Sequence, residues 1–179
     1  MTDTYIWQKV RNRFYSMKRT VLNKETGEKE TEWFPYFRKL VIDDEGNVDE
    51  VNEITYEDFK DEESVRLNVI EPNKTMISLS DDIWFEIFPL HSQPFQKEWG
   101  RSGRGRWIFG VQVNINCPKD LGTYDLDEVY DFIADNFRSG DIFDGVRVTE
   151  TAYRSSARIV DDTFYSMPVT IMFRADLAK

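Results

Sequence analysis

The C-terminal half of the chain alternates apolar and polar positions with the two-residue period that is typical of β-strands. The clearest run is 107–117, in which valine and isoleucine alternate with glutamine and asparagine. Similar alternation predicts strands over 146–149 and 168–174. A shorter segment, 156–160, is expected to pair with the last of these strands. These runs together predict the strands of a sheet.

After the first of these strands, apolar residues recur at the spacing of an amphipathic helix over 126–138. Asp125 is expected to be its N-cap, and Glu128 is expected to complete a capping box, because the two side chains can satisfy free backbone N–H groups. Gly140 is expected to be the C-cap glycine. A strand, a helix and further strands predict a mixed α+β unit.

The N-terminal half shows a different pattern. A stripe of apolar residues at helical spacing predicts an amphipathic helix over 5–17. Residues 18–56 contain short strand-like runs around two turns, at Gly27 and Gly46, and these predict two β-ribbons. Further short strands are expected at 65–70, 76–79 and 83–88.

We therefore expect an α+β fold with a mixed, mainly antiparallel sheet, an N-terminal helix, one central amphipathic helix and an inserted β-ribbon region. A chain of 179 residues can bury one good core, so 1–179 is expected to form a single domain. Residues 18–80 are predicted to be an insertion or a separately paired lobe. The N-terminus carries charges through its apolar positions, unlike an export signal, and this favours a cytosolic protein.

The charge of the chain is concentrated in one segment. Residues 43–63 contain eleven acids and a single base, Lys60, which accounts for the whole net charge of −10. A solvated acidic loop is the plainest interpretation of such a run. A protein that binds DNA without sequence preference needs a dense basic surface, and the composition of the chain as a whole argues against one.

Candidate catalytic chemistry is sparse in the sequence. The single histidine, His91, lies between two prolines without a G-x-S-x-G motif, so a Ser-His-Asp or Cys-His system is not expected. The single cysteine, Cys117, excludes an intramolecular disulfide and a multi-cysteine metal site. The acids of 43–63 lack the spacing of an EF-hand. We expect no cofactor and no enzymatic activity, and a carboxylate-based enzyme or ligand-binding module is the less favoured alternative.

A glycine- and arginine-rich segment, 100–110, precedes the strand at 107–117. It lacks the lysine of a P-loop and leads into a strand rather than a helix, so it is not a phosphate-binding motif of that kind. Two interpretations remain open, a basic surface loop or a segment that contacts a neighbouring subunit or a polyanion. In the second interpretation Arg101, Arg104 and Arg106 make the contact.

From Trp84 onward the chain resembles the tail-terminator (minor tail protein U-like) family of long-tailed bacteriophages. The matching pieces, in order, are WFEIFPL, the Gly/Arg loop, the strand and helix of IFGVQVNINCPKDLGTYDLDEVYDFIADNFRSGDIF, the strand of GVRVTETAY, and the closing FYSMPVTIMFRAD. The order of these elements carries the resemblance, which covers about half of the chain and its first fifteen residues. Residues 18–80 look longer than the corresponding part of that family.

The resemblance implies a structural protein of the virion tail that assembles in the host cytoplasm. Such a protein forms a homohexameric ring, caps the tail tube, ends tube polymerisation and provides the surface on which the head docks. Its implied partners are further copies of itself, the major tail tube protein and a head-completion or neck protein. Genome DNA would pass through the ring without specific binding. Another phage neck or head-completion protein of related fold is the alternative.

An acidic segment would suit the lumen of such a ring, because like charges repel the DNA that slides through it. On this hypothesis, the lumen-facing residues include Asp43, Asp44, Glu45, Asp49 and Glu50. The chain is also rich in aromatic residues, at 15%. Aromatic side chains fill cores and are enriched in subunit interfaces.

Overall fold

The main sheet is built around two long antiparallel strands, β9 (Gly105–Pro118) and β13 (Phe164–Leu177), which pair along their whole length. The computed structural model describes residues 3–42, 48–53, 66–72, 82–90, 95–96, 105–119, 124–155, 159–160 and 164–177. Strand β11 (Val146–Arg154) lies beside β13, and β7 (Trp84–Leu90) lies beside β9. These strands occur in the order that the alternating pattern of the C-terminal half predicts.

Four two-residue strands complete this sheet. They are β6 (Val69–Ile70), β8 (Phe95–Gln96), β10 (Ile142–Phe143) and β12 (Ile159–Val160). Strand β6 runs parallel to β7, whereas the other described pairs in this sheet are antiparallel. The main sheet is therefore mixed and mainly antiparallel, as predicted. The predicted pairing of the segment before the last strand is confirmed at Ile159 and Val160, which lie opposite Ser166 and Tyr165.

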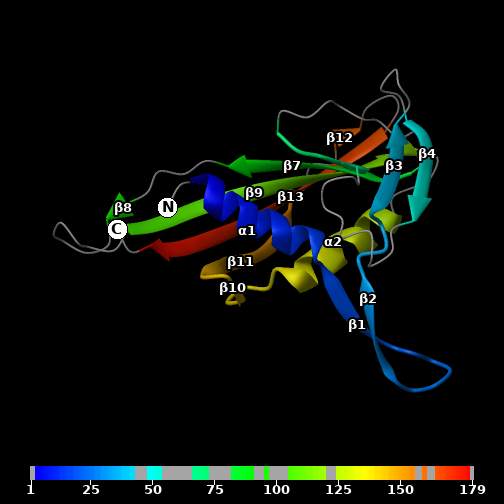
Figure 1. Cartoon of the computed structure of the whole chain (residues 1–179), viewed down its shortest axis with the longest axis horizontal. Helices are drawn as coiled ribbons and strands as arrows, with labels where there is room; N and C mark the ends of the chain where they lie inside the picture. The colour runs from blue at the N-terminus through cyan, green and yellow to red at the C-terminus, as the bar shows by residue number, and fades with distance from the viewer. Residues whose placement is uncertain are drawn as a thin grey trace.

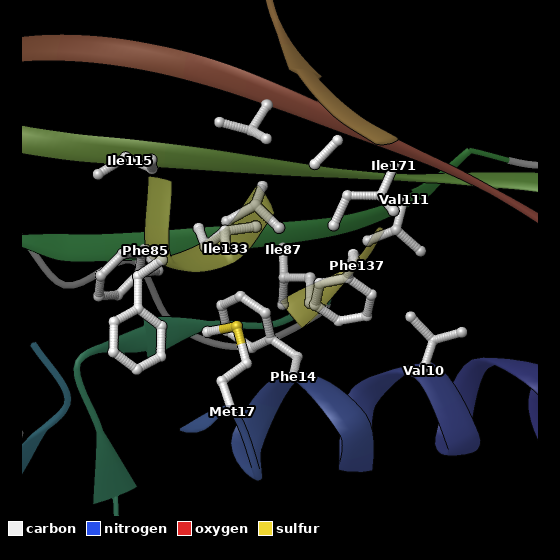
Figure 2. Packing of buried hydrophobic residues seen from close by; sticks show 14 of the residues in the cluster. Val10, Phe14, Met17, Phe85, Ile87, Val111, Ile115, Ile133, Phe137 and Ile171 are labelled. Carbon is white, nitrogen blue, oxygen red and sulfur yellow. The ribbon is translucent and has the colours of Figure 1, made fainter. Parts of the chain in front are cut away.

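Both described helices cover the same face of this sheet (Figure 1). Helix α1 (Asp3–Tyr15) places Val10 and Phe14 against it, and α2 (Tyr124–Asn136) contributes Ile133. Figure 2 shows these side chains meeting Val111 and Ile171 of the two central strands. Burial of this apolar surface is the main stabilising contribution. The two predicted helices and their apolar stripes are confirmed.

Residues 18–42 and 48–53 contain the strands of the two predicted β-ribbons. Strands β1 (Lys18–Leu22) and β2 (Lys29–Trp33) make a hairpin that projects from the body of the protein (Figure 1). Gly27 in its turn has a φ of 72°, which glycine adopts without the cost that a side chain adds. Strand β3 (Arg38–Ile42) pairs with β4 (Val48–Glu53) and with β5 (Arg66–Leu67).

The second ribbon is fastened to the main sheet through buried side chains. Phe34 and Phe37, between the two ribbons, belong to the core beneath the helices. Leu40 of β3 instead packs with Trp84 and Ile70 on the other side of the main sheet. Residues 18–80 remain a predicted insertion. The predicted turn at 43–47 and the predicted strand at 76–79 lie outside the described residues.

Both ends of α2 differ from the capping that the sequence predicts. The helix begins at Tyr124, so Asp125 lies within its first turn rather than at the N-cap. The Glu128 carboxylate accepts a hydrogen bond from Arg19, at 3.4 Å, so it serves to hold the first hairpin. Gly140 has a positive φ of 95° but lies four residues beyond the helix end, where its N–H donates to the Val148 carbonyl. It shapes the turn toward the next strands instead of capping the helix.

Candidate functional site: the helix-free face of the sheet

One face of the main sheet has no helix over it in the described part of the chain. Because side chains alternate along a strand, the residues next to the buried ones point to this second face. We call it the helix-free face. Its members on the central strands β7, β9 and β13 are Glu86, Phe88, Leu90, Ile108, Gly110, Gln112, Asn114, Thr170, Met172 and Arg174. The flanking strands β10 and β11 add Ile142, Arg147, Glu150 and Tyr153.

The helix-free face exposes large apolar side chains. Among the described residues, six large hydrophobic side chains are exposed, and five of them lie on this face. These five are Phe88 (37%), Leu90 (39%), Ile108 (37%), Ile142 (61%) and Tyr153 (48%). Scattered exposed apolar residues are normal on a protein surface, whereas their concentration on one face is typical of an interaction site.

Gly110 allows two of these strands to bring their side chains close together. A Cβ atom at this position would lie 3.1 Å from the Met172 sulfur and 3.2 Å from a Leu90 methyl carbon. The glycine therefore leaves room for Met172 and Leu90 to lean toward each other across β9. Leu90 and Met172 therefore lie on either side of Gly110 in one row across the face.

A short chain of polar hydrogen bonds lies beside the apolar surface. The Gln112 amide donates to the Asn114 side-chain oxygen at 2.8 Å, and the Asn114 amide donates to the Glu86 carboxylate at 2.9 Å. Beyond them, Trp84 is buried against Leu40, Ile70 and Phe164. Among the described residues, the ribbon that carries Leu40 thus covers one end of the face and leaves the other end, which we call the open end, uncovered.

Two arginines lie side by side near the open end. Arg147 and Arg174 are directly opposite each other on β11 and β13, and exposed Ile142 and Ile108 flank them in the same row across the sheet. Neither guanidinium forms an ion pair within the described residues. Like charges in directly opposite positions destabilise a sheet, where favourable pairs contribute about 0.2–1 kcal/mol.

In one interpretation of the sequence, three arginines contact a neighbouring subunit or a polyanion, and the structure describes one of them. Arg106 pairs with Asp176 on the adjacent strand, at 2.8 Å, and this carboxylate raises the pKa of the guanidinium. Arg106 therefore has a partner within the chain, whereas Arg147 and Arg174 form no ion pair among the described residues. Arg101 and Arg104 lie outside the described residues.

The opposite surface of the protein carries a row of acids on α2. Asp127, Asp131 and Asp135 are spaced four residues apart, so they lie along one side of the helix. Asp127 pairs with Arg154, and Asp135 pairs with Arg138 at 2.8 Å. Asp131 is exposed and has no ion-pair partner in the described part of the chain. Like charges at this spacing cost a helix roughly 0.2–0.5 kcal/mol per pair.

The acids that the sequence placed in a lumen are only partly within the described residues. Asp49 and Glu50 lie on β4, and Glu50 is opposite Val41 of β3. Asp43, Asp44 and Glu45 lie outside the described residues. Their predicted position in a lumen stays a prediction.

The two residues that the sequence offers for nucleophilic catalysis lie away from the helix-free face or outside the described ranges. No group of three or more His, Cys, Asp or Glu side chains that could hold a metal ion occurs within the described ranges. Cys117 is buried, and burial raises the pKa of its thiol to about 11, which keeps it protonated at neutral pH. His91 lies outside the described residues. No helix in the described ranges is long and apolar enough to cross a membrane.

Comparisons with known proteins do not identify the chain. No protein-family model and no curated protein matches it. One solved structure, which carries no functional name, is similar with a TM-score of 0.44 and 16% identity. The match covers 62% of this chain and 80% of the other. A likeness at this level assigns neither a fold family nor a function.

The sequence showed parts of two surfaces, the helix-free face and the acidic row of α2. The alternating pattern already placed Arg147 and Arg174 on the polar side of their strands, but it did not make them neighbours. The four-residue spacing of Asp127, Asp131 and Asp135 was also readable. Only the strand register, which sequence patterns do not define, shows that the two arginines face each other.

Proposed function

We propose that this chain is a structural subunit of a phage tail. It forms a homohexameric ring that caps the tail tube, ends tube polymerisation and provides the surface on which the head docks. Its partners are further copies of itself, the major tail tube protein and a head-completion or neck protein. The protein assembles in the host cytoplasm and becomes part of the virion tail. Genome DNA passes through the ring without specific binding.

The observation that carries this proposal is the helix-free face. An antiparallel sheet commonly leaves one face to solvent, and that face is then mostly polar. Here, within the described residues, this face leaves five large apolar side chains exposed beside two arginines that form no ion pair. Aromatic residues, methionine and arginine are enriched in protein interfaces. Such a surface favours a protein that assembles with others over one that acts on a small substrate.

The resemblance to tail terminators gives this assembly its particular form. The structure contains β7, β9, α2, β11 and β13 in the order from which that resemblance was drawn. A surface that binds a different surface of the next copy closes into a ring when the rotation between copies permits it. The ring, its hexameric state and its place on the tail come from the resemblance alone.

Electron microscopy of phage particles made without this protein tests the proposal. We expect tails of uncontrolled length that are not joined to heads, and we expect the wild-type gene supplied in trans to restore normal particles. Intact tails of normal length beside detached heads would instead indicate a neck or head-completion protein. Normal infectious particles would contradict both functions.

A further inference from the structure

The two surfaces with unbalanced charge lie on opposite sides of the same chain. Helix α2 packs its apolar side on the sheet, so its acidic row with Asp131 faces away from the sheet. Arg147 and Arg174 lie on the other face of the sheet, which no described helix covers. Among the described residues, Asp127 and Asp135 form ion pairs with arginines, whereas Asp131, Arg147 and Arg174 form none. Contact between Asp131 of one copy and the two arginines of another copy would therefore pair opposite charges.

We propose that α2 of one copy docks on the helix-free face of a second copy, with Asp131 over Arg147 and Arg174. This inference rests on the self-assembly in the proposed function and identifies the surfaces that make it. The contact covers the exposed apolar side chains of this face with a helix and gives a helix–sheet–helix arrangement. Because the two surfaces differ, the contact is head-to-tail and repeats from copy to copy.

The spacing of the charges fits this contact. Residues four apart on a helix are about 6 Å apart along its axis. Directly opposite residues on neighbouring antiparallel strands have Cα atoms about 5 Å apart. The separation of Asp131 and Asp135, the second of which also pairs with exposed Arg138, is therefore close to that of Arg147 and Arg174. The planar guanidinium group favours such paired contacts with carboxylates.

Exposed apolar side chains occur on both of the surfaces that this contact would join. The sixth exposed large hydrophobic residue, Leu22, is 62% exposed and lies at the end of β1. Its hairpin is joined to α2, since Arg19 contacts Glu128 at 3.4 Å. The docking copy therefore carries Leu22 on a hairpin that is anchored beside α2. The receiving copy offers an apolar surface that includes Ile142 and Ile108 beside the arginines.

A charge exchange tests the contact. Arg174→Asp and Asp131→Arg each remove a like-charge neighbour inside the chain, so both variants are expected to fold at least as well as the wild type. Each is expected to weaken self-association by roughly tenfold, measured as a dissociation constant by sedimentation equilibrium. The variant with both changes keeps the net charge of the wild type and is expected to regain most of the lost affinity.

Two further variants make the test specific. Glu150 lies on the helix-free face and would repel the incoming aspartates. Glu150→Gln removes this charge and is therefore expected to strengthen association. Lys119→Asp makes a similar charge reversal at the opposite end of β9 from Arg106 and is expected to have no effect. Circular dichroism and thermal unfolding verify that each variant is folded.

The outcomes separate this contact from the proposed function. Equal association of Arg174→Asp and the wild type, or no recovery in the combined variant, overturns the contact. A wild-type chain that stays monomeric up to ~1 mM also overturns it. If phage tails need the protein while Arg174→Asp caps them normally, the tail function stands and this contact is wrong. If particles without the protein are normal, the tail function fails while the association data still judge the contact.

Discussion

Arg147 and Arg174 lie directly opposite each other on β11 and β13, with no acid paired to either within the described residues. On β9, the strand next to β13, Arg106 has Asp176 as its partner at 2.8 Å. The sheet thus neutralises one arginine internally and leaves two others adjacent and uncompensated. An isolated subunit gains nothing from this arrangement, whereas a subunit that receives a partner's carboxylates does.

The first prediction concerns the stability of the unassembled chain. Arg147→Gln is expected to raise the free energy of unfolding by up to about 1 kcal/mol at low salt, because it removes the repulsion from Arg174. Arg106→Gln is the matched control. This change breaks the pair with Asp176 and is expected to lower the free energy of unfolding by about 0.2–1 kcal/mol. Urea unfolding at low protein concentration measures both. Destabilisation by Arg147→Gln would contradict the repulsion, and ~1 M salt should remove most of the effect.

A buried asparagine joins the main sheet to the second ribbon. The Asn68 amide donates to the carbonyls of Tyr36 and Ile83, at 2.9 and 2.7 Å, and its oxygen accepts from the Arg38 N–H at 2.9 Å. Asn68→Ala leaves three backbone groups without partners, at about 1–3 kcal/mol for each one that stays buried. We expect a loss of several kcal/mol in chemical unfolding. Exposed Asn12 on α1 is the control, and Asn12→Ala should change stability by less than about 0.5 kcal/mol.

The aromatic core under the helices gives a third prediction. Phe85 is fully buried, and its ring centroid lies 5.5 Å from that of Phe34 and 5.8 Å from that of Phe37. Phe85→Ala is expected to cost about 3–5 kcal/mol, because it removes apolar contacts and leaves a cavity. Leu22→Ala, at an exposed position, is expected to leave stability within about 0.5 kcal/mol. Equal effects of the two changes in urea unfolding would contradict the assigned core.

Cys117 predicts a specific loss of stability in alkali. Burial, followed by the charges of Asp125 and Asp82, raises the pKa of its thiol from 9.0 to about 11. Above pH 9 the unfolded chain releases this proton while the folded chain keeps it, so stability falls as pH rises toward 11. The contribution of one group is at most about 1.4 kcal/mol per pH unit.

The measurement for this effect is the slope of unfolding free energy against pH from 9 to 11. Cys117→Ala is expected to show a shallower fall than the wild type, even though the variant is less stable at pH 7. Other groups that ionise in alkali are common to both proteins and cancel in the difference between the two slopes. Identical slopes would show that the thiol is not held protonated by the fold.

Local patterns were sufficient to predict the elements of this fold. The period of two in 107–117 and the helical stripe through Ile133 each involve neighbours in sequence, and both elements are present. The caps of α2 were mispredicted because Asp125, Glu128 and Gly140 fit a capping pattern by type, although their backbone positions serve the helix interior and the following turn. Element boundaries depend on such details.

The candidate interaction surface could be predicted only in part. The sequence shows that Arg147 and Arg174 lie on the polar side of their strands, but β11 reaches β13 with register shifts after Val148. Such irregularities determine which side chains become neighbours, and no local pattern encodes them. The sequence instead drew attention to Arg101, Arg104 and Arg106, because they are close together along the chain.

Disulfide trapping tests head-to-tail self-assembly most directly. In a chain with Asp131→Cys and Arg174→Cys, the docked surfaces bring the two new thiols of neighbouring copies together, while buried Cys117 stays unreactive. After mild oxidation, a denaturing gel without reductant should show a ladder of covalent multimers that ends at the hexamer. Each single-cysteine variant should give no ladder. A double variant that stays monomeric, or that stops at a dimer, would contradict the repeating head-to-tail contact.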